Sequence, residues 1–227
     1  TIRTAVAAWL SDATAAEATY GHISTWETSG VTDMSFLFCG AAGYESYGCN
    51  TAAVSFNENI GAWDPSSVKS MAYMFIFASA FDQDIGGWAV HSVRDMYGMF
   101  RGASSFDQDI SGWAVQSVTS MAYMFRDASS FNQDIGGWAL DSVVDMTRMF
   151  DNEDYGSAFD QDLGWCVDYG VDFDSDDNDD TLKDAFDGTW CASTSCGVVQ
   201  LISCTHSASP TSRPAPKPTQ RPTPKPT

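Results

Sequence analysis

Four aspartates near the C-terminal end of the chain have the spacing of a calcium-binding loop. They occupy three alternating positions and one further along: Asp172, Asp174, Asp176 and Asp180. Alternating carboxylates suit Ca²⁺, which takes about 6–8 oxygen ligands in a flexible geometry. The segment lacks the central glycine and the final glutamate of an EF-hand, where Asp177 and Lys183 stand. We expect either a weak calcium site or an exposed acidic loop, and no other cofactor.

A second set of carboxylates recurs at equivalent places in the middle of the chain. The pairs are Asp82/Asp84, Asp107/Asp109, Asn132/Asp134 and Asp160/Asp162. If these segments stack like strands, about 4.7–4.9 Å apart, like charges repel by about 1 kcal/mol per pair even in water. Two interpretations remain open. One carboxylate per segment accepts backbone N–H groups as a structural ladder, or the rows bind divalent cations.

The chain has six cysteines, and this even number is typical of an oxidising compartment. Cys39 and Cys49 bracket an insertion, which predicts a local disulfide. The other four are Cys166, Cys191, Cys196 and Cys204. They predict two disulfides with three possible pairings. Zinc held by these thiols and His206 is the alternative, although the cysteines lack the paired spacing that zinc sites favour.

No set of residues with a catalytic spacing is present. The three histidines, His22, His91 and His206, fall in unrelated contexts. The chain contains no glycine-rich phosphate loop, no Gly-x-Ser-x-Gly and no His-Glu-x-x-His. A pair of carboxylates could serve a glycosidase, but any choice among 30 acids is arbitrary. We therefore expect that the protein is not an enzyme.

The elements that position these residues repeat with a period of 25 residues between Phe56 and Phe150. The register is shown by one tryptophan and one isoleucine per unit: Trp63, Trp88, Trp113 and Trp138, with Ile60, Ile85, Ile110 and Ile135. Self-similarity at such a period is typical of stacked architectures. The tryptophans are expected to fill the core; a sugar-stacking platform is the alternative if they face solvent.

Each unit divides into two parts. From Ser92 the apolar residues recur at helical steps of three and four, and Asp95 completes a start resembling a capping box. The next part, around Phe106 and Ile110, predicts a brief extended segment. One short helix and one short parallel strand per unit predict an α/β, leucine-rich-repeat-like solenoid of about six coils. A helix would cap it at the N-terminal end and disulfides would staple the C-terminal cap.

The units resemble a known repeat family. The resemblance lies in Ser117–Phe125, then Ala128–Ile135, then Trp138, and extends over about residues 20–165. These segments resemble the BspA-type leucine-rich repeat of bacterial and protist surface proteins and mycoplasma lipoproteins. The resemblance implies adhesion or binding at a cell surface and names no ligand.

Composition shifts along the chain predict four segments. A capping helix is expected in 1–19, the solenoid in 20–165, a Cys-rich cap in 166–205 and a basic Pro/Thr-rich tail in 206–227. The tail has seven prolines and no acid between Ser209 and Thr227, which predicts an extended linker or a cationic wall-binding tether. The start at Thr1 and the interrupted pattern at Thr227 are what a processed piece of a longer protein would show.

The net charge of the chain limits the classes of partner that it can bind. The net charge of −19 is unsuited to nucleic acid, which needs a basic footprint, and no apolar run is long enough to span a bilayer. We expect a secreted or cell-surface module that binds an extracellular protein or glycan. The candidate binding positions are of two kinds. His91, Gln116 and Asp141 stand at equivalent places where the residue type differs between units, and Asp84, Asp109 and Asp134 belong to the acidic rows. A structural spacer without a ligand and a polysaccharide hydrolase are the competing interpretations.

Overall fold

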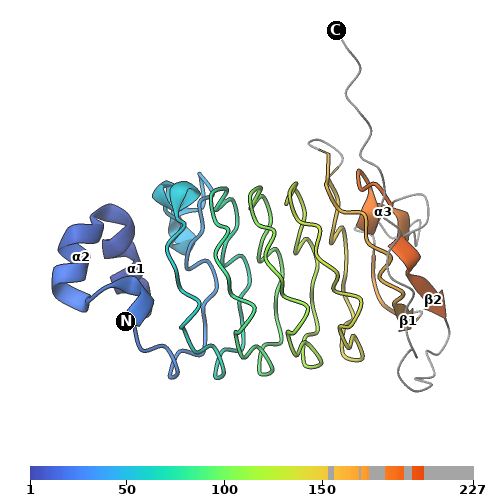
Figure 1. The fold of residues 1–227 in the computed structure, drawn as a ribbon, viewed down its shortest axis with the longest axis horizontal. Helices are drawn as coiled ribbons and strands as arrows, with labels where there is room; N and C mark the ends of the chain where they lie inside the picture. The colour runs from blue at the N-terminus through green and yellow to red at the C-terminus, as the bar shows by residue number, and fades with distance from the viewer. Residues whose placement is uncertain (153–155, 169, 174–181, 192–195, 202–227) are drawn as a thin grey trace, which may run out of the picture.

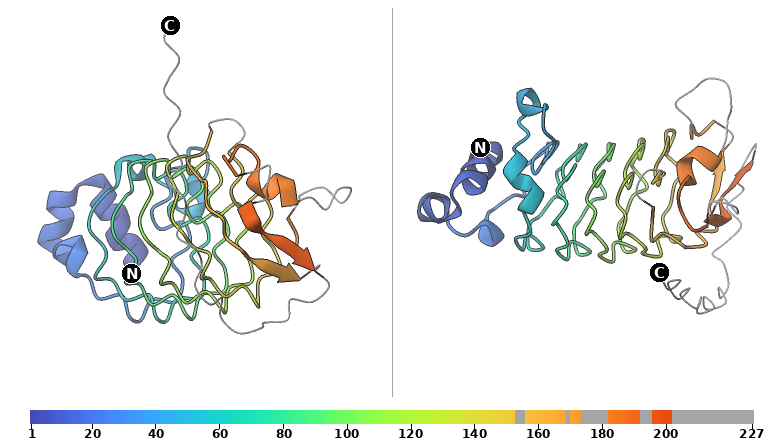
Figure 2. Two further views of the ribbon diagram at one scale, coloured as in Figure 1. Left: turned by 45° about the vertical axis from the view of Figure 1, so that its right-hand side comes forward. Right: turned by 90° about the horizontal axis from the view of Figure 1, so that it is seen from above.

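The computed structural model describes residues 1–152, 156–168, 170–173, 182–191 and 196–201. The 25-residue units stand side by side in an elongated row (Figure 1). Two helices lie at the N-terminal end of this row, and a third helix with two strands lies at the other end (Figure 1). Figure 2 shows the same order of units from two further directions. The four segments proposed from composition remain predictions.

Two helices begin the chain. Helix α1 spans Ile2–Ser11, and helix α2 spans Ala13–Tyr20. The side chain of Asp12, between them, accepts a hydrogen bond from Ala15 N and so caps α2, because the first N–H groups of a helix have no partner within it. Val6 and Trp9 of α1 are buried in the main hydrophobic core. A helix is therefore present within residues 1–19, where one was expected, with its apolar side against the units.

Successive units are joined by backbone hydrogen bonds at one segment of each unit. Isolated parallel bridges run through six residues, one per unit: Asp33, Ser70, Asp95, Ser120, Asp145 and Asp172. After each bridge, every second N–H donates to the next unit. Met96, Gly98 and Phe100 N–H, for example, donate to Ser120, Ala122 and Met124 carbonyls at 2.8–3.0 Å. The row is held together by this ladder of hydrogen bonds.

The helix predicted from Ser92 does not form. The segment is a series of tight turns, in which Met99 and Arg101 N–H donate three residues back to Met96 and Gly98 carbonyls. Gly98 and Gly102 have positive φ, 56° and 69°. An α-helix cannot continue through that backbone conformation. Asp95 does not act as a capping-box residue; its Oδ1 accepts from Tyr97 N within a turn.

The predicted α/β fold class is wrong. Between residues 21 and 165, the described chain has no α-helix and no strand beyond isolated bridges. Short 3-10 helices occur at Ile23–Thr25, Glu45–Tyr47 and Thr51–Ser55. The last elements are α3 (Leu182–Phe186) and a parallel pair, β1 (Cys166–Asp168) and β2 (Val199–Leu201). The described residues thus form no leucine-rich-repeat-like solenoid of six coils with a strand and a helix in each.

The core consists of stacked aromatic rings. One ladder of phenylalanines has ring centroids 5.3–5.7 Å apart and comprises Phe38, Phe75, Phe100, Phe125, Phe150 and Phe186. The tryptophans are buried, and Trp63, Trp88, Trp113 and Trp138 each donate Nε1–H to an isoleucine carbonyl of the preceding unit at 2.9–3.2 Å. The prediction that these tryptophans belong to the core is confirmed.

Candidate functional site

The first acid or amide of each predicted pair belongs to a hydrogen-bonded ladder. Its members are Asn57, Asp82, Asp107, Asn132 and Asp160, and the Oδ1 of each of the first four accepts the N–H of the next at 2.9–3.0 Å. Each of these Oδ1 atoms also accepts Nε2–H from a glutamine of the next unit. Of the two interpretations of the acidic rows, these contacts match the structural ladder, because one side-chain oxygen, Oδ1, of each accepts N–H donors.

The second acid of each pair closes a turn at the surface. Asp84, Asp109 and Asp134 are exposed, and each Oδ1 accepts the N–H two residues on at 3.0 Å. The side-chain and backbone hydrogen bonds from Ser111 lower the pKa of Asp109. These aspartates lie one unit apart, as predicted, and their hydrogen bonds are explained by local turn chemistry.

The variable positions His91, Gln116 and Asp141 are exposed at equivalent places of neighbouring units. A short contact joins two of these units, because Ser142 Oγ donates to the Gln116 carbonyl at 2.7 Å. The pKa of Asp64 is lowered mainly by hydrogen bonds from the Ser66 backbone and side chain, with a smaller contribution from the charge of His91. A binding role for this row remains a prediction.

The calcium loop cannot be followed through its whole length. Asp172 lies in the last bridge, and its carbonyl accepts Met146 N–H at 2.7 Å. Asp174, Asp176 and Asp180 lie outside the described residues. Among the residues that are described, no group of three or more His, Cys, Asp or Glu could hold a metal ion. The calcium site stays a prediction.

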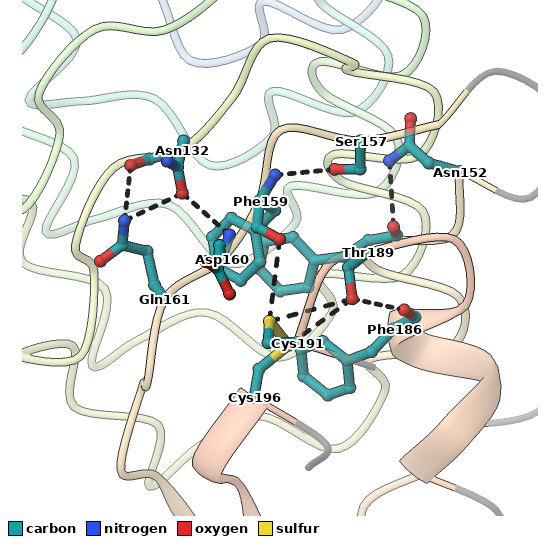
Figure 3. The surroundings of a disulfide bond; sticks show 11 residues. Asn132, Asn152, Ser157, Phe159, Asp160, Gln161, Phe186, Thr189, Cys191 and Cys196 are labelled. Carbon is teal, nitrogen blue, oxygen red and sulfur yellow. Dashed lines mark hydrogen bonds between the residues drawn. A yellow bond between two sulfur atoms is a disulfide. The ribbon is translucent and has the colours of Figure 1, made fainter. Parts of the chain in front are cut away.

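The cysteines among the described residues form disulfides. Cys39 is bonded to Cys49, and Cys191 is bonded to Cys196. Cys166 is also disulfide-bonded, whereas Cys204 and His206 lie outside the described residues. Figure 3 shows the Cys191–Cys196 bond beside Phe159 and Phe186, where the aromatic core and the Asn132–Asp160 ladder end. The zinc alternative is excluded for Cys166, Cys191 and Cys196, because a disulfide sulfur is not a thiolate ligand.

A continuous row of aromatic rings crosses the segments that carry the tight turns. We call it the aromatic strip: Tyr44, Tyr47, Phe36, Tyr73, Tyr97 and Tyr123. Successive ring centroids along this order are 6.1, 5.4, 4.9, 5.0 and 5.3 Å apart. Unlike the phenylalanine and tryptophan ladders, no ring of the strip is fully buried. Rings with an apolar body and a polar hydroxyl at the surface are suited to binding.

The strip begins in the loop that the Cys39–Cys49 disulfide closes. Tyr44 and Tyr47 in this loop are 49% and 61% exposed. Phe36 and Tyr73 pack against the small cluster that contains both cysteines. The disulfide therefore fixes the exposed end of the strip against its half-buried middle.

Arginines flank the other end of the strip. The guanidinium carbons of Arg101 and Arg126 lie 5.7 and 5.6 Å from the centroid of the Tyr123 ring. Arg101 also lies over the ring of Phe77, at 5.9 Å. Contacts of this length are cation–π interactions. Tyrosine and arginine together are the side chains that dominate the energetics of many binding surfaces.

Sequence reasoning missed the strip because its tyrosines break the 25-residue register. Tyr73 and Tyr123 are equivalent, but Tyr97 comes one position early, and Gly98 occupies the equivalent place. A Cβ on Gly98 would lie 2.8 Å from two ring carbons of Tyr73. Two units have Ala-Tyr at this place, and the unit between them has Tyr97-Gly98. This difference between units is the sequence feature that could have predicted the strip.

A family model matches two overlapping segments of the chain, residues 8–49 and 45–165. Its description is "Mycoplasma protein of unknown function, DUF285". The chain belongs to this family. No curated protein and no solved structure matches the chain significantly.

The DUF285 match covers the aromatic strip from Phe36 to Tyr123 and both acidic rows up to Asp162. The description of DUF285 names no ligand or activity, so the function of the site must be argued from its geometry. Among the described residues, no helix has the length and apolar composition needed to cross a membrane.

Proposed function

We propose that this DUF285 protein is a secreted or cell-surface module that binds an extracellular protein or glycan and catalyses no reaction. The observation that carries the proposal is the aromatic strip, a partly exposed row of rings that ends at two arginines. Most other aromatic residues in the units are stacked in the core, so these rings are not required to fill it.

Two further observations support an extracellular binding role. The disulfides suit an oxidising compartment. The units resemble BspA-type leucine-rich repeats, for which adhesion at a cell surface is the implied role. The variable positions His91, Gln116 and Asp141 provide a second exposed row on the same units.

The competing function is a spacer without a specific ligand. It is favoured by the regularity of the hydrogen-bond and ring ladders, which make the row of units a rigid rod. A spacer needs no partly exposed tyrosines, and burial of their rings in the core would be more favourable. The strip therefore favours binding over a purely structural role.

The experiment compares the wild type with a Tyr44→Ser/Tyr47→Ser variant on an array of glycans and extracellular matrix proteins. Both tyrosines are exposed, so their removal should leave the fold intact. Val144→Ser is the matched control, because Val144 is 59% exposed and lies outside the strip. Binding that is lost in the double variant and kept in the control supports the proposal. Equal binding by all three proteins overturns the assignment of the strip as the binding surface, and no binding by the wild type overturns the proposed function.

A further inference from the structure

Arg101 and Arg126 both lie over the Tyr123 ring, but among the described residues Arg126 has carboxylate partners and Arg101 has none. Arg126 Nε lies 3.4 Å from Asp151 Oδ2 and 3.7 Å from Asp127 Oδ2. Arg148 pairs with Asp151 at 4.0 Å, and Arg3 at the N-terminal end pairs with Asp33 at 3.0 Å. Within the part of the chain that the structure describes, no ion pair involves Arg101. This is notable in a chain with 30 acids and 11 basic residues.

Arg101 is held in place by rings instead of by an acid. Its guanidinium lies between Phe77 and Tyr123, and its side chain is only partly exposed. Its Nε is buried and has no hydrogen-bond partner. Guanidinium groups stacked on aromatic rings are pre-organised for planar, bidentate recognition of carboxylates. An anion supplied by a ligand would give this cation the partner that the chain does not.

The shape of the strip restricts the ligand to a linear chain. The strip is one ring wide, and it crosses four neighbouring units from Phe36 to Tyr123. A stable protein partner would typically bury about 800 Å² on each side, which needs a broad patch rather than a single row. The hydroxyl edges of the tyrosines can both donate to and accept from sugar hydroxyls. These features favour an extended polysaccharide.

The neighbouring charges restrict the ligand further. Two arginines have their guanidinium over the Tyr123 ring. Arg126 pairs with Asp127 and Asp151, which leaves Arg101 to pair with an added anion at this end of the strip. A polysaccharide with a carboxylate on every sugar would place further negative charges against a strongly acidic protein. A chain with carboxylates separated by neutral sugars avoids this repulsion.

We propose that the aromatic strip binds a linear polysaccharide in which carboxylate-bearing sugars alternate with neutral ones. One carboxylate is held by Arg101 at the Tyr123 end, and neighbouring sugars lie along the tyrosine hydroxyls toward the Tyr44 loop. This inference deepens the proposed function and rests on it, because it names the ligand class of the same surface.

The experiment uses hyaluronan oligosaccharide, a linear chain with a carboxylate on every second sugar, and its carboxyl methyl ester as the uncharged match. Binding to the full chain is measured by titration calorimetry at low ionic strength. The wild type should bind the ester about 10- to 100-fold more weakly, the range expected when hydrogen bonds to a charged group are lost. Arg101→Gln should bind the acid form as weakly as the wild type binds its ester.

Arg94→Gln is the matched control, since Arg94 is an exposed arginine of the same unit, and it should bind like the wild type. The comparison of acid and ester needs only the wild type, so the test does not depend on the folding of a variant. Equal binding of acid and ester overturns the carboxylate assignment and leaves the proposed function standing. If neither oligosaccharide binds, but a protein on the array binds in a way that requires Tyr44 and Tyr47, the polysaccharide assignment alone is overturned. Failure of every ligand overturns both.

Discussion

The ring of Phe77 occupies the space that a side chain on Gly102 of the next unit would need. A Cβ built on Gly102 would lie 2.6 Å from Cε1 of Phe77 and closer still to Cδ1. Gly102 also has φ of 69°, a conformation that residues with a Cβ rarely adopt. Arg101 lies over both the Phe77 ring and the Tyr123 ring. Gly102 thus makes room for one of the two rings that contact the arginine.

Gly102→Ala should destabilise the protein by about 2–5 kcal/mol. The left-handed backbone contributes about 1–2 kcal/mol, and the overlap with Phe77 contributes about 1–3 kcal/mol. The measurement is the free energy of unfolding by denaturant. Gly137→Ala is the control, because nothing lies within 4 Å of its added Cβ.

A double-mutant cycle with Phe77→Ala separates the two causes. In the absence of the Phe77 ring, Gly102→Ala should retain only the backbone part of its cost. The same cost in both backgrounds would show that Phe77, which is 39% exposed, moves aside freely and does not depend on the glycine.

Asp107→Ala should cost about 1–3 kcal/mol, because it leaves Asn132 N–H and Gln133 Nε2–H without the oxygen that they share. Asp107→Asn should be close to neutral, since it keeps the Oδ1 acceptor and asparagine already occupies equivalent places at Asn57 and Asn132. The comparison is made by urea unfolding in the absence and presence of Mg²⁺. Mg²⁺ stabilisation of the wild type that Asp107→Asn abolishes would favour the cation interpretation of the row over the structural ladder.

Sequence reasoning identified the buried positions of each unit but assigned them to the wrong backbone. Val93, Met96, Met99, Phe100 and Ala103 are all buried. Steps of three and four residues bring side chains to one side of an α-helix, and a series of three-residue turns does the same. What distinguishes the two is the positive φ at Gly98 and Gly102. In other units the equivalent residues also have positive φ: Tyr73, Phe77, Tyr123 and Asp127. Their residue types do not predict this conformation.

The acidic rows were predictable because each pair recurs at a fixed spacing. The aromatic strip was not predictable in this way, because Tyr97 lies one position before the place equivalent to Tyr73, and Tyr44 and Tyr47 come from an irregular insertion. The side-by-side arrangement of units brings these rings together. A search for periodicity finds what is equivalent between units, whereas a binding surface uses what differs.

Loss of the Cys39–Cys49 disulfide should loosen the exposed end of the strip. The bond closes a loop with a sequence separation of 10, and its removal by Cys39→Ser/Cys49→Ser should cost about 2–3 kcal/mol in the chain-entropy account. Limited proteolysis should then cut near Tyr44 and Tyr47. Cys191→Ser/Cys196→Ser, which opens a separation of 5, is the control and should cost about 2 kcal/mol without exposing that loop. Equal resistance of the loop in both variants would mean that ring stacking alone orders it.

The last prediction concerns the tyrosines of the strip at alkaline pH. Burial raises the pKa of Tyr97 to about 12, with smaller contributions from its hydrogen bond to Tyr73 and from the charge of Asp145. In the unfolded chain the pKa of a tyrosine is about 10. Between these two values the folded protein holds a proton that the unfolded chain has released, so the free energy of unfolding falls as pH rises through this window.

Tyr97→Phe should reduce this dependence on pH, because the late-titrating hydroxyl is gone. Burial also raises the pKa of Tyr123, so part of the slope should remain. Arg101 lowers the pKa of Tyr97, and Arg101→Gln should therefore move the ionisation of Tyr97 to still higher pH. The measurement is the free energy of unfolding against pH together with tyrosinate absorbance, with the denatured protein as reference. If Tyr97→Phe leaves the pH dependence of the unfolding free energy unchanged and removes absorbance that appears near pH 10, Tyr97 ionises as a solvated tyrosine, and its place between Tyr73 and Tyr123 in the strip is refuted.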